Sequence, residues 1–559
     1  MTLIECVPNF SEGRDKKVIE AIADAVRAVP GVALLDVDPG AATNRTVYTF
    51  AGQPEDVLEA AFQAIKKGVE LIDMRRHKGE HARQGACDVC PFVPISEASM
   101  AECVELARRL AERVGRELQF PVYLYAEAAT RPERRRLPDL RAGEYEALEE
   151  KLKKPEWKPD FGPARFDPKA GATAIGARGF LIAYNVNLNT TSVPLAKDIA
   201  FAIRESGRLK KDAKGSKVLN ADGTEQRVPG LFKAVQATGW LIPEYGRAQV
   251  TINILDIDAS PVHKVYDACC DLAAKAGLRV TGSEVVGMLP RRVLLEAGRY
   301  FLKKQNQSVG VSDDELVRTG ALSLGLSDVA PFDPKAKVIE ERFKEDGPMA
   351  AMSLKEFLKE LASRSPAPGG GSVAALAGAL GAALCSMVSA LTYDKKGFEG
   401  VRDRMEDMAV KAQGHMKDLL KAVDDDAASF NAVMAAFGLP KGDDAQKAAR
   451  KKAIEEATKA ATVEPLAVLE KQLPVLDCAL FAAENGNPNS VSDAGVAALM
   501  ARAAAQSAYY NVLINLAGLE DKAWRSSMHK KAEDALAGVK TKADQVDALM
   551  LEKLRAPLK

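Results

Sequence analysis

Two patterns of hydrophobic and polar positions divide the chain near residue 330. Before it, runs that alternate β-branched and aromatic residues, such as VALLDVD and NRTVYTFAG, are interleaved with segments whose apolar side chains recur every three or four positions, such as VIEAIADAVRAV. The first pattern predicts strands and the second predicts amphipathic helices. The order strand, helix, strand, strand, helix, strand occurs twice, as in a split ferredoxin-like sheet with helices on one face. We therefore expect an α+β N-terminal half with two ferredoxin-like α/β subdomains, at residues 1–178 and 179–330.

The second half has almost no β-branched alternation. Residues 331–350 resemble a linker, and residues 351–559 contain 45 alanines, which indicates closely packed antiparallel helices. We expect an all-α C-terminal helical bundle domain. Residues 365–393 carry no charge and are long enough to cross a bilayer, but their Ala, Gly and Ser content is weak for a membrane span. A helix buried on all sides of a soluble bundle is the favoured interpretation.

Composition narrows the classes of partner. Lys and Arg number 77 and Asp and Glu number 77, so no overall field attracts nucleic acid or an acidic membrane. The eight cysteines are scattered through apolar runs, as expected of reduced thiols in the cytoplasm, and MTLIECVPNF resembles a strand rather than a signal peptide. We expect a cytoplasmic protein with small-molecule partners, no nucleic acid and no membrane. Cys87 and Cys90 form one lone C-x-x-C, a weak signal for zinc or redox chemistry.

His77, Glu80 and His81 form H-x-x-E-H, the inverted zinc-protease pattern. Two histidines four residues apart bind one zinc ion only on a continuous helix, where they share a face. Gly79 lies between them, and the preceding helix is predicted to end near Arg75. A histidine in a glycine-containing loop beside Glu80 titrates near neutrality and is suited to proton transfer. Zinc binding, a plain surface loop and acid–base catalysis are the three interpretations, and we favour the last.

Polar residues also gather where one predicted strand ends and the next begins. Asp36 and Asp38 end the first of these strands, and Asn44 and Arg45 begin the second. The carboxylates suit a cationic substrate group, and the guanidinium suits a carboxylate. A hairpin with solvated turn residues explains the pattern equally well.

Two stretches of the second half carry candidate chemistry. In PAPGGGSVAAL, three glycines precede a predicted helix, and the free N–H groups at the start of that helix suit an anion. The stretch is not a phosphate-binding P-loop, because no Gly-Lys-Ser/Thr follows. A tight turn that allows close helix packing is the alternative. Asp424, Asp425 and Asp426 interrupt an Ala-rich helix. Adjacent helix positions point about 100° apart, so at most one or two of the three carboxylates face inward. An inward carboxylate has a raised proton affinity, whereas a solvated acidic face has no such role.

These stretches, in this order, resemble the formimidoyltransferase-cyclodeaminase family over nearly the whole chain. ECVPNFSEG, LLDVD, TNRTVYTF, RHKGEH, DVCPF, RAGEYEAL, GATAIGAR and VQATGW resemble its formimidoyltransferase part, and SRSPAPGGGSVAA, VDDDAASF and YYNVLINL resemble its cyclodeaminase part. The resemblance implies two consecutive steps of histidine breakdown in the cytoplasm, without metal. Formimidoyl passes from N-formimidoyl-glutamate to nitrogen 5 of tetrahydrofolate; nitrogen 10 then attacks, ammonia leaves and 5,10-methenyltetrahydrofolate forms. Polyglutamylated tetrahydrofolate is the implied co-substrate, and a homo-oligomer built from dimers is the implied assembly.

The resemblance also implies site residues. His81 corresponds to the catalytic histidine of the transferase, with His77 as support, and Asp426 corresponds to the acid of the cyclodeaminase. By their charge, and not from the resemblance, Asp38 would steady the positively charged amidine, and Arg45 or Lys233 would hold carboxylates of the substrate or of the folate tail. The family's folate-binding stretch corresponds to Gly162, Pro163, Ala164, Arg165, Phe166, Asp167, Pro168, Lys169, Ala170 and Gly171. The candidates from residue chemistry add Asn44 and the turn Gly369, Gly370, Gly371 and Ser372 as binding residues.

The chain departs from the family at two places. Lys233 alone remains of a basic pair before V-Q-x-x-G-W, and residues 206–230 form an insertion whose Asn-Ala-Asp-Gly resembles a hairpin tip. Three rival functions stay open: a zinc peptidase, a formyl transferase that uses N-formylglutamate, and a non-catalytic folate-binding scaffold.

Overall fold

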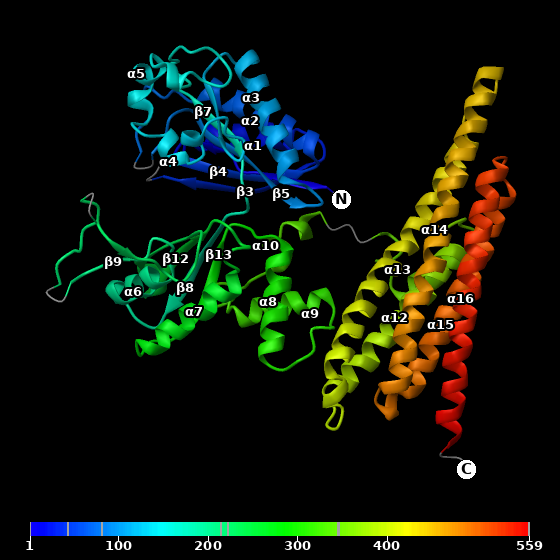
Figure 1. Ribbon diagram of the computed structural model, residues 1–559. Helices are drawn as coiled ribbons and strands as arrows, with labels where there is room; N and C mark the ends of the chain where they lie inside the picture. Colours follow the sequence, from blue (N-terminus) through cyan, green and yellow to red (C-terminus); the bar gives the residue numbers. More distant parts are fainter. Residues whose placement is uncertain are drawn as a thin grey trace. The chain divides into compact units, whose positions relative to one another are not determined.

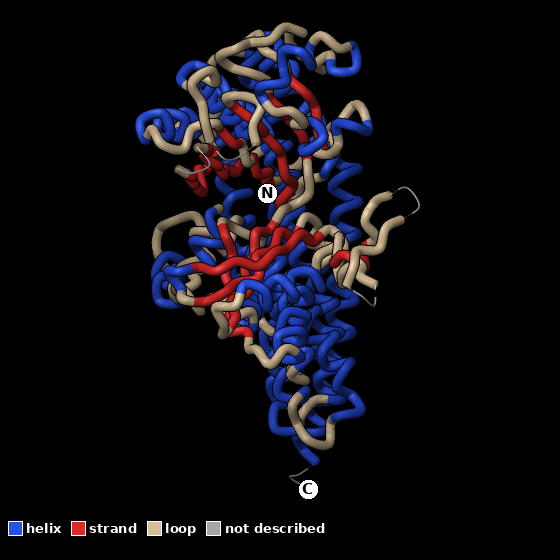
Figure 2. The backbone as a smooth tube through the Cα atoms, turned by 90° about the vertical axis from the view of Figure 1, so that its left-hand side faces the viewer, coloured by secondary structure: helices blue, strands red, loops and turns tan. Residues whose placement is uncertain are grey.

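The computed structural model describes residues 2–41, 44–79, 82–212, 215–220, 223–343 and 347–556. The chain forms two compact units, one of residues 1–294 with 321–343 and one of residues 295–320 with 344–559. Every strand of the described residues belongs to the first unit, and the second unit consists of helices and their connections (Figure 1). Figure 2 colours the strands red and the helices blue. The predicted fold class, an α+β half followed by an all-α half, is confirmed.

The first sheet has seven strands, four of which follow the ferredoxin-like order β3-β4-β1-β5 with antiparallel pairing. Beyond β5 the sheet continues with β7 and β6, both paired in parallel. The short β2 pairs with β4 and β5. The elements are β1 (Leu3–Cys6), β2 (Asn9–Phe10), α1 (Lys16–Arg27), β3 (Val32–Gly40), β4 (Arg45–Gly52), α2 (Pro54–Leu71), β5 (Cys87–Ser96), α3 (Met100–Glu117), β6 (Val122–Ala126), α4 (Leu137–Leu140), α5 (Leu148–Leu152) and β7 (Thr173–Ala177).

The second sheet repeats the same order with four antiparallel strands, β11-β12-β8-β13. Both predicted ferredoxin-like arrangements are therefore present. Within residues 206–230, the paired β9 and β10 form the base of a two-stranded ribbon. The elements are β8 (Ile182–Leu188), α6 (Val193–Ile203), β9 (Arg208–Leu209), β10 (Arg227–Val228), β11 (Val235–Ile242), β12 (Arg247–Ile254), α7 (Val262–Lys275) and β13 (Val280–Val286).

Local sequence sets the ends of the helices that pack on the first sheet. The Asp15 carboxylate accepts the N–H of Lys17 at the start of α1, and Ser99 with Glu102 forms a capping box at the start of α3. The apolar faces of α1, α2 and α3 bury against one face of the sheet in a single core. α2 ends at Leu71, one turn before the predicted end, so the residues that follow it form a loop.

Five long helices dominate the described part of the second unit. α12 packs against α13, α14 and α15, and α16 packs against α14 and α15. Fully buried alanines let helices approach closely, as Ala375 and Ala382 of α12 and Ala497 and Ala501 of α15 illustrate. The long helices are α12 (Gly370–Tyr393), α13 (Arg402–Phe437), α14 (Asp444–Asn485), α15 (Val491–Ala517) and α16 (Lys522–Arg555). Among the shorter helices, α11 (Leu354–Leu361) belongs to the second unit and α10 (Pro334–Lys337) to the first, while α8 (Arg291–Lys304) begins in the first unit and continues into the second, and α9 (Asp313–Ser323) lies in the second except for its last three residues.

The uncharged segment forms α12, a helix of 24 residues. Within the described ranges it is the one helix long and apolar enough to span a membrane by length and composition, and 56% of its most apolar stretch is buried. It packs within the bundle as predicted, but the expectation of burial on all sides is wrong. Large apolar side chains of α12 and its neighbour α15 are exposed: Val373, Leu380, Met387, Leu391, Val496, Leu499, Tyr510 and Ile514.

Residues 295–320 group with the helices of the second unit. The backbone N–H of Val309 donates to Glu406 Oε1 over 3.1 Å, and Lys417 Nζ donates to Asp313 Oδ2 over 3.1 Å. The limit of the second subdomain at residue 330 stays a prediction from sequence.

Candidate functional site

The loop after α2 contains the first candidate site. His77 Nε2 lies 2.7 Å from the backbone oxygen of Asn44, which only accepts, so Nε2 carries the proton. Nδ1 accepts a hydrogen bond from Arg83 Nε over 3.3 Å and is therefore unprotonated. Burial lowers the pKa of His77 below its ordinary value, which favours the same neutral imidazole. With both ring nitrogens engaged, His77 holds the loop in place and is not free to move protons.

Glu80 and His81, the other two residues of the H-x-x-E-H pattern, lie outside the described residues. The structure therefore does not test the assignment of His81 as the catalytic histidine. His77 itself lies in a loop and not on a helix, which removes the geometry that the zinc pattern requires. No cluster of three or more His, Cys, Asp and Glu side chains suited to a metal ion occurs among the described residues.

Asn44 connects this loop to the hairpin of β3 and β4. Its backbone is left-handed, with φ at 48°, a conformation that Asn tolerates better than most residues. Its Oδ1 accepts from the Gly13 N–H and its Nδ2 donates to the Lys78 carbonyl, each over 3.0 Å. Its backbone oxygen also accepts a hydrogen bond from His77 Nε2. Asn44 therefore connects three segments: its own hairpin, the segment at Gly13 and the loop at His77 and Lys78. The predicted binding role of Asn44 is thus joined by a structural one.

Arg45 forms a buried ion pair. Its NH1 lies 2.5 Å from Asp88 Oδ2, and its Nε donates to Asn9 Oδ1 over 3.0 Å. Arg141 NH2 lies 2.5 Å from the same carboxylate oxygen, and the Asp88 side chain is fully buried. The Arg45 and Arg141 side chains are only 11% and 12% exposed, and this burial lowers the pKa of Arg141. Asp88 thus fixes both guanidiniums beside the loop.

Asp38 is exposed on β3, opposite Val47. Asp36, two positions earlier, is half-buried; burial raises its pKa, and the charge of Asp38 raises it further. The two carboxylates are therefore close enough to interact, and Asp38 is the one in contact with solvent.

The segment from Gly162 to Gly171 lies against the His77 loop. The Met74 N–H donates to the Lys169 carbonyl over 3.0 Å, and the Ala86 N–H donates to the Ala170 carbonyl over 2.8 Å. Gly162 and Gly171 have left-handed φ values of 78° and 71°, which a side chain would strain. The structure thus places the end of the predicted folate-binding stretch beside the loop that contains His77.

A hollow of about 400 Å³ opens beside this loop and is lined by Lys78, Gly79, Arg83, Gly143, Glu144 and Glu146. Arg83 forms ion pairs with the two carboxylates of this hollow: its NH1 lies 3.1 Å from Glu144 Oε2, and its NH2 lies 2.7 Å from Glu146 Oε1. Lys233, in contrast, is exposed before β11 in the second sheet, and its carbonyl accepts from Ser260 Oγ. Its contacts, among those that the structure describes, do not reach this loop.

The second candidate site lies at the start of α12. Ser372 Oγ donates to Asp426 Oδ2 of α13 over 2.9 Å, and the Ser372 side chain is fully buried. Burial raises the pKa of Asp426, while hydrogen bonds from the Ser372 hydroxyl and backbone N–H oppose the rise. A Cβ on Gly371 would lie only 2.0 Å from Asp426 Oδ1, so the carboxylate occupies the space that a side chain at this position would need. The structure therefore joins the glycine turn and Asp426 in one cluster.

The other two carboxylates of the Asp run have different partners. Asp424 accepts the backbone N–H groups of Met349 and Ala350 over 2.8 and 3.1 Å, and Asp425 pairs with Lys421. Three adjacent carboxylates thus point in three directions, as the helix geometry predicts.

Sequence reasoning did not identify Glu464 of α14. Burial raises its pKa, and the charges of Asp425 and Asp426 raise it further, so Glu464 stands near the Asp run. It could not be found from sequence because no pattern in α14 indicates that this position faces α13.

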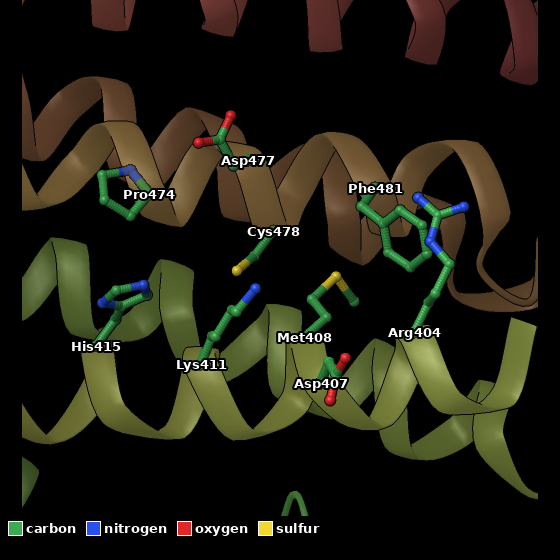
Figure 3. A pocket seen from close by; sticks show the side chains of 9 residues that line it. All are labelled: Arg404, Asp407, Met408, Lys411, His415, Pro474, Asp477, Cys478 and Phe481. Carbon is green, nitrogen blue, oxygen red and sulfur yellow. The ribbon is translucent and has the colours of Figure 1, made fainter.

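A separate groove of about 390 Å³ runs between α13 and α14 (Figure 3). Arg404 lies over the Phe481 ring, 4.3 Å from its centroid, and Lys411 and Asp407 bring both signs of charge to the same wall. Eleven helix positions separate His415 of the groove from Asp426, a distance of about 16 Å along α13. The groove therefore contains none of the predicted site residues.

Three family descriptions match the chain in order. Residues 3–178 match the formiminotransferase domain, N-terminal subdomain, residues 183–344 match the formiminotransferase domain, and residues 353–534 match formiminotransferase-cyclodeaminase. The matches cover both units.

Individual relatives show the same division. The formimidoyltransferase-cyclodeaminase of Rattus norvegicus is 43% identical over 557 residues, which is 99% of each chain. The glutamate formimidoyltransferase of Streptococcus pyogenes serotype M1 is 39% identical over 54% of this chain and 94% of its own. The methenyltetrahydrofolate cyclohydrolase of Methylorubrum extorquens is 45% identical over 33% of this chain and 89% of its own.

Proposed function

Since the chain belongs to the formimidoyltransferase-cyclodeaminase family, we propose that it catalyses two consecutive reactions of histidine degradation. It transfers formimidoyl from N-formimidoyl-L-glutamate to tetrahydrofolate, and it then cyclises 5-formimidoyltetrahydrofolate to 5,10-methenyltetrahydrofolate with release of ammonia. The observation that carries the proposal is the 43% identity to a bifunctional relative over 99% of both chains. A similarity confined to one unit would support only one of the two reactions.

In the transfer step, we assign proton transfer to His81. Attack by nitrogen 5 on the formimidoyl carbon gives a tetrahedral intermediate; the attacking nitrogen loses a proton and the departing glutamate nitrogen gains one, so one imidazole near its pKa serves both. The engaged nitrogens of His77 support this choice, because they leave that histidine no free lone pair. His77, Asn44 and Arg83 then act by holding the loop.

Binding residues are assigned by charge. Asp38 is exposed and suits the cationic amidine, and Arg45, oriented by Asp88, suits a substrate carboxylate. The stretch from Gly162 to Gly171 is assigned to folate because it hydrogen-bonds to the His77 loop. Lys233 is assigned to the folate tail by its positive charge, as the one residue left of the family's basic pair.

In the cyclisation step, we assign proton donation to Asp426. Ammonia leaves only after its nitrogen is protonated, and a partly buried carboxyl with a raised pKa holds a proton closer to neutral pH than an exposed one. Gly369, Gly370 and Gly371 start α12 beside this group, and their N–H groups suit the pteridine or a carboxylate.

The remaining assignments concern co-substrate, assembly and location. Polyglutamylated tetrahydrofolate serves as co-substrate, and no metal takes part. The exposed apolar side chains of α12 and α15 support a homo-oligomer built from dimers, since water-exposed Leu, Met and Ile at helical spacing favour burial against a second copy. The eight cysteines, all within the described residues, form no disulfide, and seven of them are buried, which supports the cytoplasm as location.

A second candidate activity concerns the helical unit alone. The 45% identity to a methenyltetrahydrofolate cyclohydrolase favours hydrolysis of the methenyl bridge at the Asp426 cluster. Both reactions pass through a carbon bonded to nitrogen 5, to nitrogen 10 and to a third group. That group is an amino group that leaves as ammonia in one reaction and a hydroxyl group that comes from water in the other. Loss of methenyl absorbance from supplied 5,10-methenyltetrahydrofolate would reveal it.

The test mixes the full-length protein with N-formimidoyl-L-glutamate and tetrahydrofolate and follows methenyl absorbance and ammonia. His81→Ala is expected to stop transfer while supplied 5-formimidoyltetrahydrofolate is still cyclised, and Asp426→Ala is expected to do the reverse. N-formylglutamate as donor tests the formyl alternative, and a chelator tests the zinc alternative. A native protein that binds folate but forms neither product would contradict the proposal and favour the scaffold.

A further inference from the structure

We propose that Asn511 of α15 is a substrate-binding residue of the cyclisation site and that its carboxamide oxygen accepts a hydrogen bond from the nitrogen that leaves as ammonia. This inference rests on the proposed function of the helical unit. It adds a third helix to a site that the sequence assigned to α12 and α13 alone.

The carboxamide of Asn511 is held in one orientation. Its Nδ2 donates to the backbone oxygen of Ser507, one turn earlier on the same helix, over 2.9 Å. In a planar amide this leaves Oδ1 as a fixed acceptor, and no donor to that oxygen occurs among the described residues. Asn is a poor helix former, and here it lies inside a helix of 27 residues.

This amide faces the start of α12. A Cβ on Gly370 would meet Asn511 Nδ2 at 3.5 Å and Oδ1 at 3.7 Å, which are ordinary contact distances. The next residue, Gly371, is the one against which the Asp426 carboxylate rests. Asn511 and Asp426 therefore face consecutive glycines from different helices, and both are partly accessible to solvent.

The step needs an acceptor as well as an acid. When nitrogen 10 bonds to the formimidoyl carbon, that carbon carries nitrogen 5, nitrogen 10, hydrogen and an amino group. The bond from carbon to the amino nitrogen then breaks, the electron pair leaves with that nitrogen, and the proton it gains balances the one that nitrogen 10 loses. An acceptor that binds one N–H of the amino group turns the lone pair of that nitrogen toward the acid. Asn511 Oδ1 is a fixed acceptor that faces Gly370, the glycine next to the one that the Asp426 carboxylate lies against.

The test compares full-length native protein with Asn511→Ala, Asn511→Asp and Asn515→Ala, using supplied 5-formimidoyltetrahydrofolate. Asn515 is a matched control because it lies one turn further along α15 and its Nδ2 donates to the Ala461 backbone oxygen of α14 over 2.8 Å. The transfer rate of each variant serves as a check on the other unit.

We expect Asn511→Ala to lower kcat for cyclisation by about tenfold or more with KM changed by less than about threefold, because the hydrogen bond acts on the departing nitrogen. Asn515→Ala is expected to keep kcat within about twofold of native even where its melting temperature falls. Asn511→Asp places a second carboxylate at the same end of α12 as Asp426, and its charge is expected to move the alkaline limb of the pH–rate profile to higher pH. This arm keeps the test decisive if the alanine variant does not fold.

Native-like kcat in Asn511→Ala, an equal loss in Asn515→Ala, or an unmoved alkaline limb in a folded Asn511→Asp would each overturn the inference while native protein stays active. A native protein that cyclises nothing would instead overturn the proposed function, and this inference with it.

Discussion

The close packing of the Asp426 carboxylate against Gly371 allows the cyclisation site to be tested by the substitution Gly371→Ala, which adds a single methyl group. A Cβ added at Gly371 would lie 2.0 Å from Oδ1 and 2.5 Å from Cγ of Asp426, where real Cβ contacts essentially never fall below 3.0 Å. In Gly371→Ala the carboxylate or the start of α12 must therefore move by about 1 Å, and a shift of that size in a reacting group lowers a rate by about 100-fold.

Stability is expected to change little in this variant. Ala is favoured over Gly in a helix by about 1 kcal/mol, which offsets part of the cost of the displaced carboxylate. Cyclisation of supplied 5-formimidoyltetrahydrofolate is therefore expected to fall about 100-fold while transfer from N-formimidoyl-L-glutamate stays at the native rate. The melting temperature of the helical unit reports whether the fold is kept.

Gly414→Ala is the matched control. Gly414 also lies in a helix, α13, and a Cβ there meets nothing within 4 Å, so this variant gains the same helix preference without a clash. The reasoning is refuted if Gly371→Ala cyclises within about threefold of native, or if Gly414→Ala loses as much, because a shift of about 1 Å at the acid should cost far more.

Three further predictions concern single interactions. Ser372→Ala removes a hydrogen bond that stabilises the charged form of Asp426, so the pKa of Asp426 should rise further. The pH above which cyclisation slows should then move upward. An unchanged pH–rate profile would contradict the role of Asp426 as the acid. Asp88→Asn removes the buried charge that Arg45 and Arg141 share and is expected to lower the free energy of unfolding by about 3–5 kcal/mol. In a urea titration of the full chain, the first unfolding transition should then occur at a lower urea concentration. A loss under about 1 kcal/mol would show that the cluster is well solvated. Because burial lowers the pKa of His77, the stability from this neutral side chain is complete above the pKa of an unfolded histidine, about 6.5, and is lost as pH falls through the lower folded value. His77→Gln should remove that acid-side loss in thermal scans, and an identical pH dependence in this variant would argue that His77 is not the group concerned.

The fold was predictable from sequence because periodicity is a local signal. Alternating runs such as VALLDVD mark strands, and the repeated order of strands and helices leads to the same ferredoxin-like arrangement in both sheets. Alanine content identified the helical half in the same way. The three adjacent aspartates also behave as helix geometry requires, since only Asp426 turns to Ser372.

The partners of the site residues were not predictable, because they lie far apart in sequence. Asn44 binds the loop that follows the next helix, and Arg45 pairs with Asp88 on another strand. Asp88 lies within DVCPF, a motif that carried the resemblance, but its spacing from Arg45 contains no signal of a contact. Asn511 likewise lies within YYNVLINL, and only the packing of α15 beside α12 brings it to Gly370.

The seam between α12 and α15 limits how this half of the protein can be altered by evolution or design. Ala382, Ala497 and Ala501 are fully buried there, and a Cβ on Gly381 would lie 2.9 Å from the Ala497 carbonyl. Any replacement larger than alanine adds volume at a place with no room, so a viable change needs a compensating change on the facing helix at the same time. Single-residue libraries should therefore lose most of their members at this seam while the outward positions of the same helices accept many replacements. The pair of helices can be redesigned only as a pair.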